Sequence, residues 1–141
     1  MAEENNEAMI YHAEDESIIR NLVRSIVGMI PGSHLEQHEE GSGLLKKLAN
    51  GEVQAPAVVV IDNQMPGATG LELMAYARDP LYGGKVPFIF ISGDGADVLR
   101  SALDSGAYAT FGKPFNLMEL KSTIEEAAEY SRNSLRDEEK D

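Results

Sequence analysis

The segment that most constrains the fold is Ala57–Ile61, which leads directly into Asp62 and then into the turn residues Pro66 and Gly67. Four of its five residues are β-branched. A short apolar run that ends at turn residues is typical of a strand buried on both faces of a parallel sheet. Asp62 is therefore expected at the carboxyl end of a central strand, where open α/β sheets bind ligands. Because a buried carboxylate is costly unless it is paired, other parts of the chain must supply its partner.

The composition limits the classes of function. The chain has 141 residues, which is enough for one domain with a substantial core. Its formal net charge of −12 argues against nucleic acid as a partner. The absence of cysteine excludes disulfides and thiolate metal sites. No apolar run is long enough to cross a membrane, and residues 1–8 have no signal pattern, so we expect a soluble cytoplasmic protein.

Strands and helices alternate along the chain. Short apolar segments predict further strands, at 9–13, 33–38, 86–91 and 108–112. The segment 33–38 contains one aliphatic residue and is expected at a sheet edge. Apolar residues at helical spacing predict the helices, over 18–30, 43–49 and 70–78, after Asp94, and after Asn116, with a loop over 79–84. This alternation predicts a doubly wound α/β fold with a five-stranded parallel sheet and helices on both faces.

One folded domain accounts for the whole pattern. We expect it to span residues 9–130, between an acidic tail at 1–8 and a polar, solvated tail at 131–141. Three polar residues are placed to cap helices within it. Thr69, with Glu72 three residues later, forms a capping box, and Asn116 and Asp94 are the other two predicted caps.

Polar side chains directly follow four of the predicted strands. They are Glu14 and Asp15, Asp62, Ser92 and Lys113. Parallel strands end at the same sheet edge, so we expect these side chains to share one pocket. Three carboxylates that close together need a cation between them, and oxygen ligands favour Mg²⁺, Mn²⁺ or Ca²⁺. In such a pocket Asp62 would be a nucleophile toward phosphorus, while the metal and Lys113 neutralise charge.

Two histidine-containing segments have simpler interpretations than metal binding. His12 lies inside the first predicted strand and is expected to be a core or sheet-edge histidine. The run His38-Glu39-Glu40 has metal-ligating side chains but is expected to be a solvated turn. Neither is predicted to be a ligand.

These motifs together resemble the receiver domain of two-component response regulators, from residue 9 to residue 130. The matching motifs are Glu14-Asp15, the D-x-x-M-P-G run at 62–67 with Gly70 after it, Ser92-Gly93, and Lys113-Pro114-Phe115. The resemblance implies a flavodoxin-like sheet in the order 2-1-3-4-5. It also implies that Asp62 accepts a phosphoryl group from a histidine kinase or a histidine phosphotransfer protein.

The resemblance further implies the roles of the other site residues. Glu14, Asp15, Asp62 and the main-chain carbonyl of Gln64 would hold Mg²⁺, or Mn²⁺ in its place. Ser92 and Lys113 would contact the phosphoryl group. The protein would then be no metabolic enzyme, catalysing only its own phosphorylation and dephosphorylation. It would signal by contacts with an undetermined downstream protein or by onward phosphotransfer, as a monomer or as a phosphorylation-dependent dimer.

The sequence departs from the family pattern at the switch position. Thr110 stands where many receivers have an aromatic residue, so the usual aromatic switch is missing. Tyr108 is expected on the same strand face as Thr110, because side chains alternate along a strand, whereas Phe111 is expected in the core. We therefore expect activation to work through Ser92 and the loop 93–96, with Tyr108 responding.

Two other classes of function remain open at this point. One is a pseudo-receiver that binds a partner without phosphorylation, although no pocket residue is lost. The other is an aspartyl-nucleophile phosphohydrolase. Enzymes resembling the haloacid dehalogenases have a second acid two residues after the nucleophile, where this chain has Gln64. A nucleotide or flavin binder is not supported, because no Gly-rich loop follows the first strand.

Overall fold

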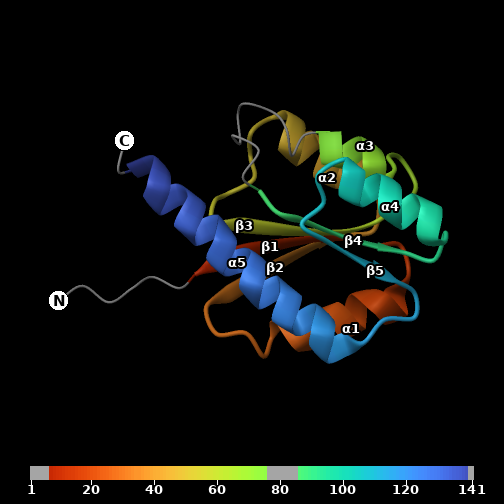
Figure 1. Ribbon diagram of the computed structural model, residues 1–141, viewed down its shortest axis with the longest axis horizontal. Coiled ribbons are helices and arrows are strands. Elements are labelled where there is room, and N and C mark those ends of the chain that lie inside the picture. The colour runs from red at the N-terminus through yellow and green to blue at the C-terminus, as the bar shows by residue number, and fades with distance from the viewer. Residues whose placement is uncertain (1–6, 76–85, 140–141) are drawn as a thin grey trace.

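A computed structural model describes residues 7–75 and 86–139 of the chain (Figure 1). Within these ranges, strands and helices alternate in five pairs. The strands are β1 Ala8–Ala13, β2 Ser33–His38, β3 Ala57–Asp62, β4 Phe88–Ser92 and β5 Ala109–Gly112. The helices are α1 Ser17–Val27, α2 Gly41–Ala49, α3 Gly70–Met74, α4 Ala96–Asp104 and α5 Leu117–Glu139. The predicted end of the third helix near 78 and the predicted loop at 79–84 lie outside the described residues.

The five strands form one parallel sheet in the order β2-β1-β3-β4-β5, as predicted. The weakly apolar strand β2 is at an edge, also as predicted. The register aligns the carboxyl ends of the strands, because Asp62 is opposite Ile91 and Ser92 is opposite Gly112. The residues that end the inner strands therefore meet at one edge of the sheet.

Helices cover both faces of the sheet (Figure 1). Helices α1 and α5 lie on one face, and α2, α3 and α4 lie on the other. Strand β3 shows why its sequence is apolar throughout: Val58 and Val60 pack in the core layer under α1 and α5, while Val59 and Ile61 pack in the opposite layer. All six residues of β3 are buried, including Asp62.

Helix α5 is longer than the sequence predicts. A solvated tail is expected from Ser131, but α5 continues to Glu139. Ser131 is buried, and its hydroxyl accepts a hydrogen bond of 3.0 Å from the amide of Ala57 at the start of β3. Because this stretch is polar in sequence, its contact with β3 was not predicted. Although α5 is long, the described part of the chain has no helix with the length and apolarity of a membrane span.

Two of the three predicted caps are confirmed. Thr69 and Glu72 form the capping box of α3, and Asn116 accepts a hydrogen bond of 3.0 Å from the amide of Glu119. The prediction for Asp94 is wrong, because the residue before α4 is Gly95 and no side chain caps the helix. Gly95 has a φ of +104°, a backbone conformation that favours glycine. The carboxylate of Asp94 is used elsewhere.

Two strands also begin later than predicted. Strand β4 starts at Phe88 rather than at 86, since Pro87 has no amide hydrogen to give to a ladder. Strand β5 starts at Ala109 rather than at Tyr108. Neither difference moves the carboxyl ends of the strands, where the polar residues are.

Candidate functional site

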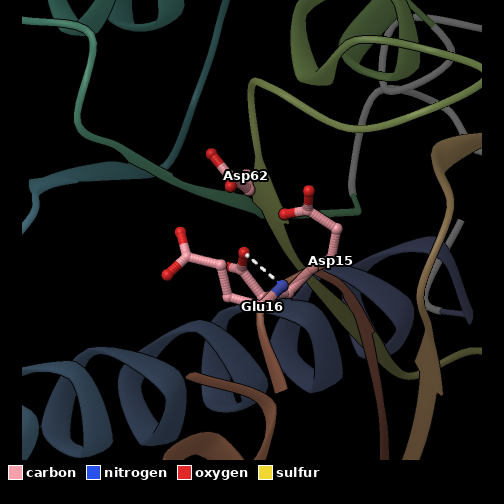
Figure 2. Close-up of side chains that lie close together, drawn as sticks. Asp15, Glu16 and Asp62 are labelled. Atoms are coloured by element: carbon pink, nitrogen blue, oxygen red, sulfur yellow. Dashed lines mark hydrogen bonds between the residues drawn. The ribbon is translucent and has the colours of Figure 1, made fainter. Parts of the chain in front are cut away.

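Four carboxylates meet at the carboxyl edge of the sheet. Glu14, Asp15 and Glu16 lie in the loop between β1 and α1, and Asp62 is the last residue of β3. Each offers one oxygen, and these oxygens all lie within 4.8 Å of one another. Figure 2 shows that Asp15, Glu16 and Asp62 lie close together. The sequence predicted three of these acids but not Glu16, whose only signal is its position next to Asp15.

Lys113 supplies the positive charge of this cluster. It follows β5 directly, and its Nζ donates hydrogen bonds to Asp62 Oδ2 at 2.9 Å and to Glu16 Oε1 at 3.1 Å. A third, longer bond reaches Glu14 Oε2 at 3.4 Å. Burial opposes the charged form of Lys113, but the hydrogen bond to Asp62 and the charge of Glu14 outweigh it and raise the pKa of Lys113. The side chain of Lys113 therefore stays protonated at neutral pH.

Glu14 is the most deeply buried acid of the cluster. Its side chain is 1% exposed, and its Oε2 accepts a hydrogen bond of 3.3 Å from the amide of Glu16. Burial, followed by the charge of Asp62, raises the pKa of Glu14 to about 8, although Lys113 opposes this shift. Oε1 of Glu14 lies 3.2 Å from Lys113 Nζ without hydrogen-bond geometry, and this buried oxygen has no hydrogen-bond partner among the described residues.

This donor set fits a hard divalent cation. The cluster supplies carboxylate oxygens, which are hard ligands that Mg²⁺ prefers, and one of them, Glu14 Oε1, is buried without a hydrogen-bond partner among the described residues. The negative charges outnumber the single ammonium that contacts them, so a cation would also relieve their repulsion. The acidic cluster is thus consistent with a Mg²⁺ site, as the sequence predicted.

Arg20 holds the loop that carries these acids. Its Nη1 donates hydrogen bonds to the main-chain oxygens of Glu14, at 2.9 Å, and of Asp15, at 2.8 Å. The carbonyl of Arg20 accepts a bond of 2.8 Å from Gln37 Nε2, which lies 3.1 Å from His12 Nδ1. Burial, then the charges of Arg20 and Lys113, lowers the pKa of His12 to about 3, so His12 is a neutral core residue.

The run His38-Glu39-Glu40 forms no metal site of its own. His38 ends β2 and lies 2.7 Å from Glu36 Oε2 through its Nε2, so it is a strand residue rather than part of a turn. Glu39 forms an ion pair of 3.3 Å with Arg20. Within 7–75 and 86–139, the acidic cluster at Asp62 is the one group that could hold a metal ion.

Ser92 ends β4 beside the acidic cluster but faces another acceptor. The residue is 1% exposed, and its hydroxyl donates a hydrogen bond of 2.9 Å to Asp94 Oδ2. The amide of Asp94 in turn donates to Ser92 Oγ at 3.0 Å. Asn63, which follows Asp62, donates from Nδ2 to the same Oδ2 of Asp94 at 3.0 Å. The sequence signalled neither of the contacts to Asp94 Oδ2.

The other predicted residues lie around this centre. The amide of Gln64 donates a long hydrogen bond of 3.4 Å to Asp62 Oδ1. Thr110 is half-buried in β5. Tyr108 is exposed just before β5, and its ring centroid lies 5.7 Å from that of Tyr130 in α5. Phe111 is only half-buried, against the core layer of α1 and α5.

Gly70 allows α3 to approach the backbone of Asp62. A Cβ at this position would lie 2.8 Å from the carbonyl oxygen of Asp62 and 2.8 Å from the Phe90 ring. Its amide donates a hydrogen bond of 3.1 Å to the carbonyl oxygen of Asn63. The glycine after the D-x-x-M-P-G run is therefore required by this close approach.

Comparison with known families identifies the chain. The Response regulator receiver domain family matches residues 10–125, which include Glu14, Asp15, Glu16, Asp62, Ser92 and Lys113. The chain belongs to the response regulator receiver domain family of two-component signalling. Receiver domains of this family have histidine kinases as partners.

Individual relatives agree with this assignment. Over 105 residues the chain is 31% identical to a protein-glutamate methylesterase/protein-glutamine glutaminase of Treponema denticola, covering 72% of this chain and 27% of that protein. Over 102 residues it is 31% identical to the transcriptional regulatory protein CitB of Klebsiella pneumoniae, covering 69% and 42%. The chain thus spans less than half the length of either relative. The signal receiver domain of an HD domain-containing protein from Pseudomonas fluorescens has the same fold, with a TM-score of 0.80, 20% identity, and coverage of 96% of this chain and 97% of that chain.

Proposed function

We propose that this chain is a Mg²⁺-dependent phosphoacceptor whose residues 9–130 form the receiver domain and whose Asp62 receives the phosphoryl group. The donor is a histidine kinase or a histidine phosphotransfer protein. The observation that supports this most strongly is the 2.9 Å contact between Lys113 Nζ and Asp62 Oδ2 within four clustered carboxylates. It puts one nucleophilic oxygen beside a permanent cation, in a pocket whose excess negative charge calls for a second cation.

The residues divide the chemistry between them. A carboxylate oxygen of Asp62 attacks the phosphorus of a phosphohistidine, the bond from phosphorus to the imidazole nitrogen breaks, and its electron pair stays on that nitrogen. Lys113 stabilises the charge that develops on the transferred oxygens, and the Ser92 hydroxyl donates to one of them.

The metal completes the charge balance of this pocket. Glu14, Asp15, Asp62 and the main-chain carbonyl of Gln64 would hold Mg²⁺, or Mn²⁺ in its place. When bound, the ion neutralises these carboxylates and the incoming phosphoryl oxygens. Glu16, which contacts Lys113 at 3.1 Å, keeps the ammonium within the cluster.

The net charge of −12 disfavours nucleic acid as a direct partner of this chain. We infer that the phosphorylated chain acts by contact with a downstream protein or by passing its phosphoryl group onward, as a monomer or as a phosphorylation-dependent dimer. It is regulatory and catalyses only its own phosphorylation and dephosphorylation.

Wild-type protein incubated with acetyl phosphate or phosphoramidate and Mg²⁺ is expected to gain one phosphoryl group, measured as intact mass. The gain should be absent when EDTA removes the metal, because the carboxylates then repel the donor. Protein that gains no mass with Mg²⁺ present would be a pseudo-receiver instead. A gain that persists in EDTA would remove the metal from the proposal.

The switch is expected to involve Ser92 and the loop 93–96, with Tyr108 responding and Thr110 too small to do so. The Tyr108 ring contacts the Tyr130 ring. Burial and, to a smaller extent, the negative charge of Glu126 raise the pKa of Tyr108. The Tyr108 ring resonances should therefore respond to a change in these surroundings. Beryllofluoride, a phosphoryl mimic, should shift the Tyr108 ring resonances in NMR spectra. If α4 resonances shift while those of Tyr108 stay constant, Tyr108 has no part in the switch.

A further inference from the structure

We propose that Asp94 is a positioning residue that holds the Ser92 hydroxyl away from the phosphoryl site until Asp62 is phosphorylated. This inference rests on the function proposed above. The Ser92 hydroxyl donates to Asp94 Oδ2 at 2.9 Å, and the amide of Asp94 donates back to Ser92 Oγ at 3.0 Å. Asp94 does not cap α4, so its carboxylate has no competing role in that helix.

A hydroxyl has a single hydrogen to donate, so its acceptors compete. Ser92 is 1% exposed and cannot turn to water as a third choice. While its hydrogen points to Asp94, it cannot also point to a phosphoryl oxygen on Asp62. Phosphorylation must therefore break the bond between Ser92 and Asp94 before Ser92 can contribute to the site.

Asp94 is held from a second direction by the residue next to the phosphoacceptor. Asn63 Nδ2 donates to the same Oδ2 of Asp94 at 3.0 Å. The other end of this amide, Oδ1 of Asn63, is buried and has no hydrogen-bond partner in the part of the chain that the structure describes. Among the described residues, the contact with Asp94 is thus the one side-chain hydrogen bond that orients Asn63. It ties the loop after β3 to the loop before α4.

Breaking the hydrogen bond between Ser92 and Asp94 makes the phosphorylated state less favourable in free energy. A hydrogen bond contributes about 1 kcal/mol, and more when the acceptor is a carboxylate, so its loss should change an equilibrium constant by at least about fivefold. Removing the Asp94 carboxylate frees the Ser92 hydroxyl, so Asp94→Ala should bind a phosphoryl mimic at least about fivefold more tightly than wild type. The gain should depend on Ser92.

The experiment is a double-mutant cycle read by fluorine NMR titration of beryllofluoride with Mg²⁺ in excess. It compares wild type, Asp94→Ala, Ser92→Ala and the double variant. Asp94→Ala should show the fivefold gain, and the double variant should bind no more tightly than Ser92→Ala alone. Asp97→Ala, which removes a carboxylate from the first turn of α4, is the matched control and should stay within about twofold of wild type.

The possible outcomes separate the two proposals. If wild type binds beryllofluoride and Asp94→Ala binds it equally, the positioning role is wrong while the phosphoacceptor function stands. A gain of the same size in the Ser92→Ala background would mean that Asp94 acts by its charge alone, which also overturns the positioning role. If wild type itself binds no beryllofluoride, the proposed function fails, and the role of Asp94 fails with it.

Discussion

Asp62→Asn is expected to reduce phosphorylation by acetyl phosphate by at least about a thousandfold, because an amide oxygen is a far weaker nucleophile than a carboxylate. The variant should remain folded. Gly70 packs against the main-chain carbonyl of Asp62, which the substitution keeps, and Lys113 retains Glu14 and Glu16 as partners. Removing one of the two buried carboxylates also relieves the repulsion that contributes to the raised pKa of Glu14.

The matched control is Glu16→Gln. Its carboxylate contacts the same ammonium at 3.1 Å, against 2.9 Å for Asp62, but its side chain is 59% exposed. We expect Glu16→Gln to gain one phosphoryl group as wild type does, because its amide oxygen can still accept from Lys113, which also keeps Asp62 and Glu14 as partners. Thermal unfolding should show both variants folded. Continued phosphorylation of Asp62→Asn, with loss in Glu16→Gln, would mean that the nucleophile has been assigned to the wrong carboxylate.

The sheet and the centre of the site could be predicted from the sequence because both depend on strand ends. An apolar run such as 57–61 is typical of a strand buried on both faces of a parallel sheet, and parallel strands bring their carboxyl ends to one edge. Asp62 ends β3 and Lys113 directly follows β5, so their contact at 2.9 Å required only the strand order to be correct. The strand order itself came from the family resemblance.

The features that could not be predicted depend on which side chains and main-chain groups come into contact in the folded chain. Asp94 has the composition and position of a helix cap, yet its carboxylate accepts from Ser92 and Asn63 instead. Glu16 follows two other acids in the sequence, and its role as a partner of Lys113 is apparent only in the folded structure. The C-terminal part of α5 is polar, and its burial at Ser131 depends on an amide of β3 that is 74 residues away in the chain.

In the metal-free protein, the free energy of unfolding is expected to fall as the pH rises from 6.5 to 8. The pKa of Glu14 is raised from 4.5 to about 8 in the folded state, so between these values the folded chain binds a proton that the unfolded chain has lost. Stability is therefore complete below the unfolded pKa and is lost as the pH rises through about 8. One proton contributes at most about 1.4 kcal/mol per pH unit, which gives about 1–2 kcal/mol over this window.

Other groups act outside this window. His12, whose pKa is lowered from 6.5 to about 3, makes stability rise with pH, but only up to about 6.5. The raised pKa of Lys113 matters only at alkaline pH, above 10.5. The decline between pH 6.5 and 8 can thus be attributed to Glu14. Urea denaturation in EDTA at several pH values measures it.

Glu14→Gln tests this attribution, because it keeps the shape of the side chain and removes its titration. The variant should show no decline between pH 6.5 and 8, and it should be more stable than wild type at pH 8, where wild type pays for the buried charge. Saturating Mg²⁺ should flatten the wild-type profile in the same way, since a bound cation lowers the pKa of its carboxyl ligands, and should raise its stability by mass action. Glu14→Gln should lose most of that Mg²⁺ stabilisation. If the decline between pH 6.5 and 8 persists in Glu14→Gln, another group takes up the proton. If Mg²⁺ stabilises this variant as much as wild type, Glu14 is not a principal ligand.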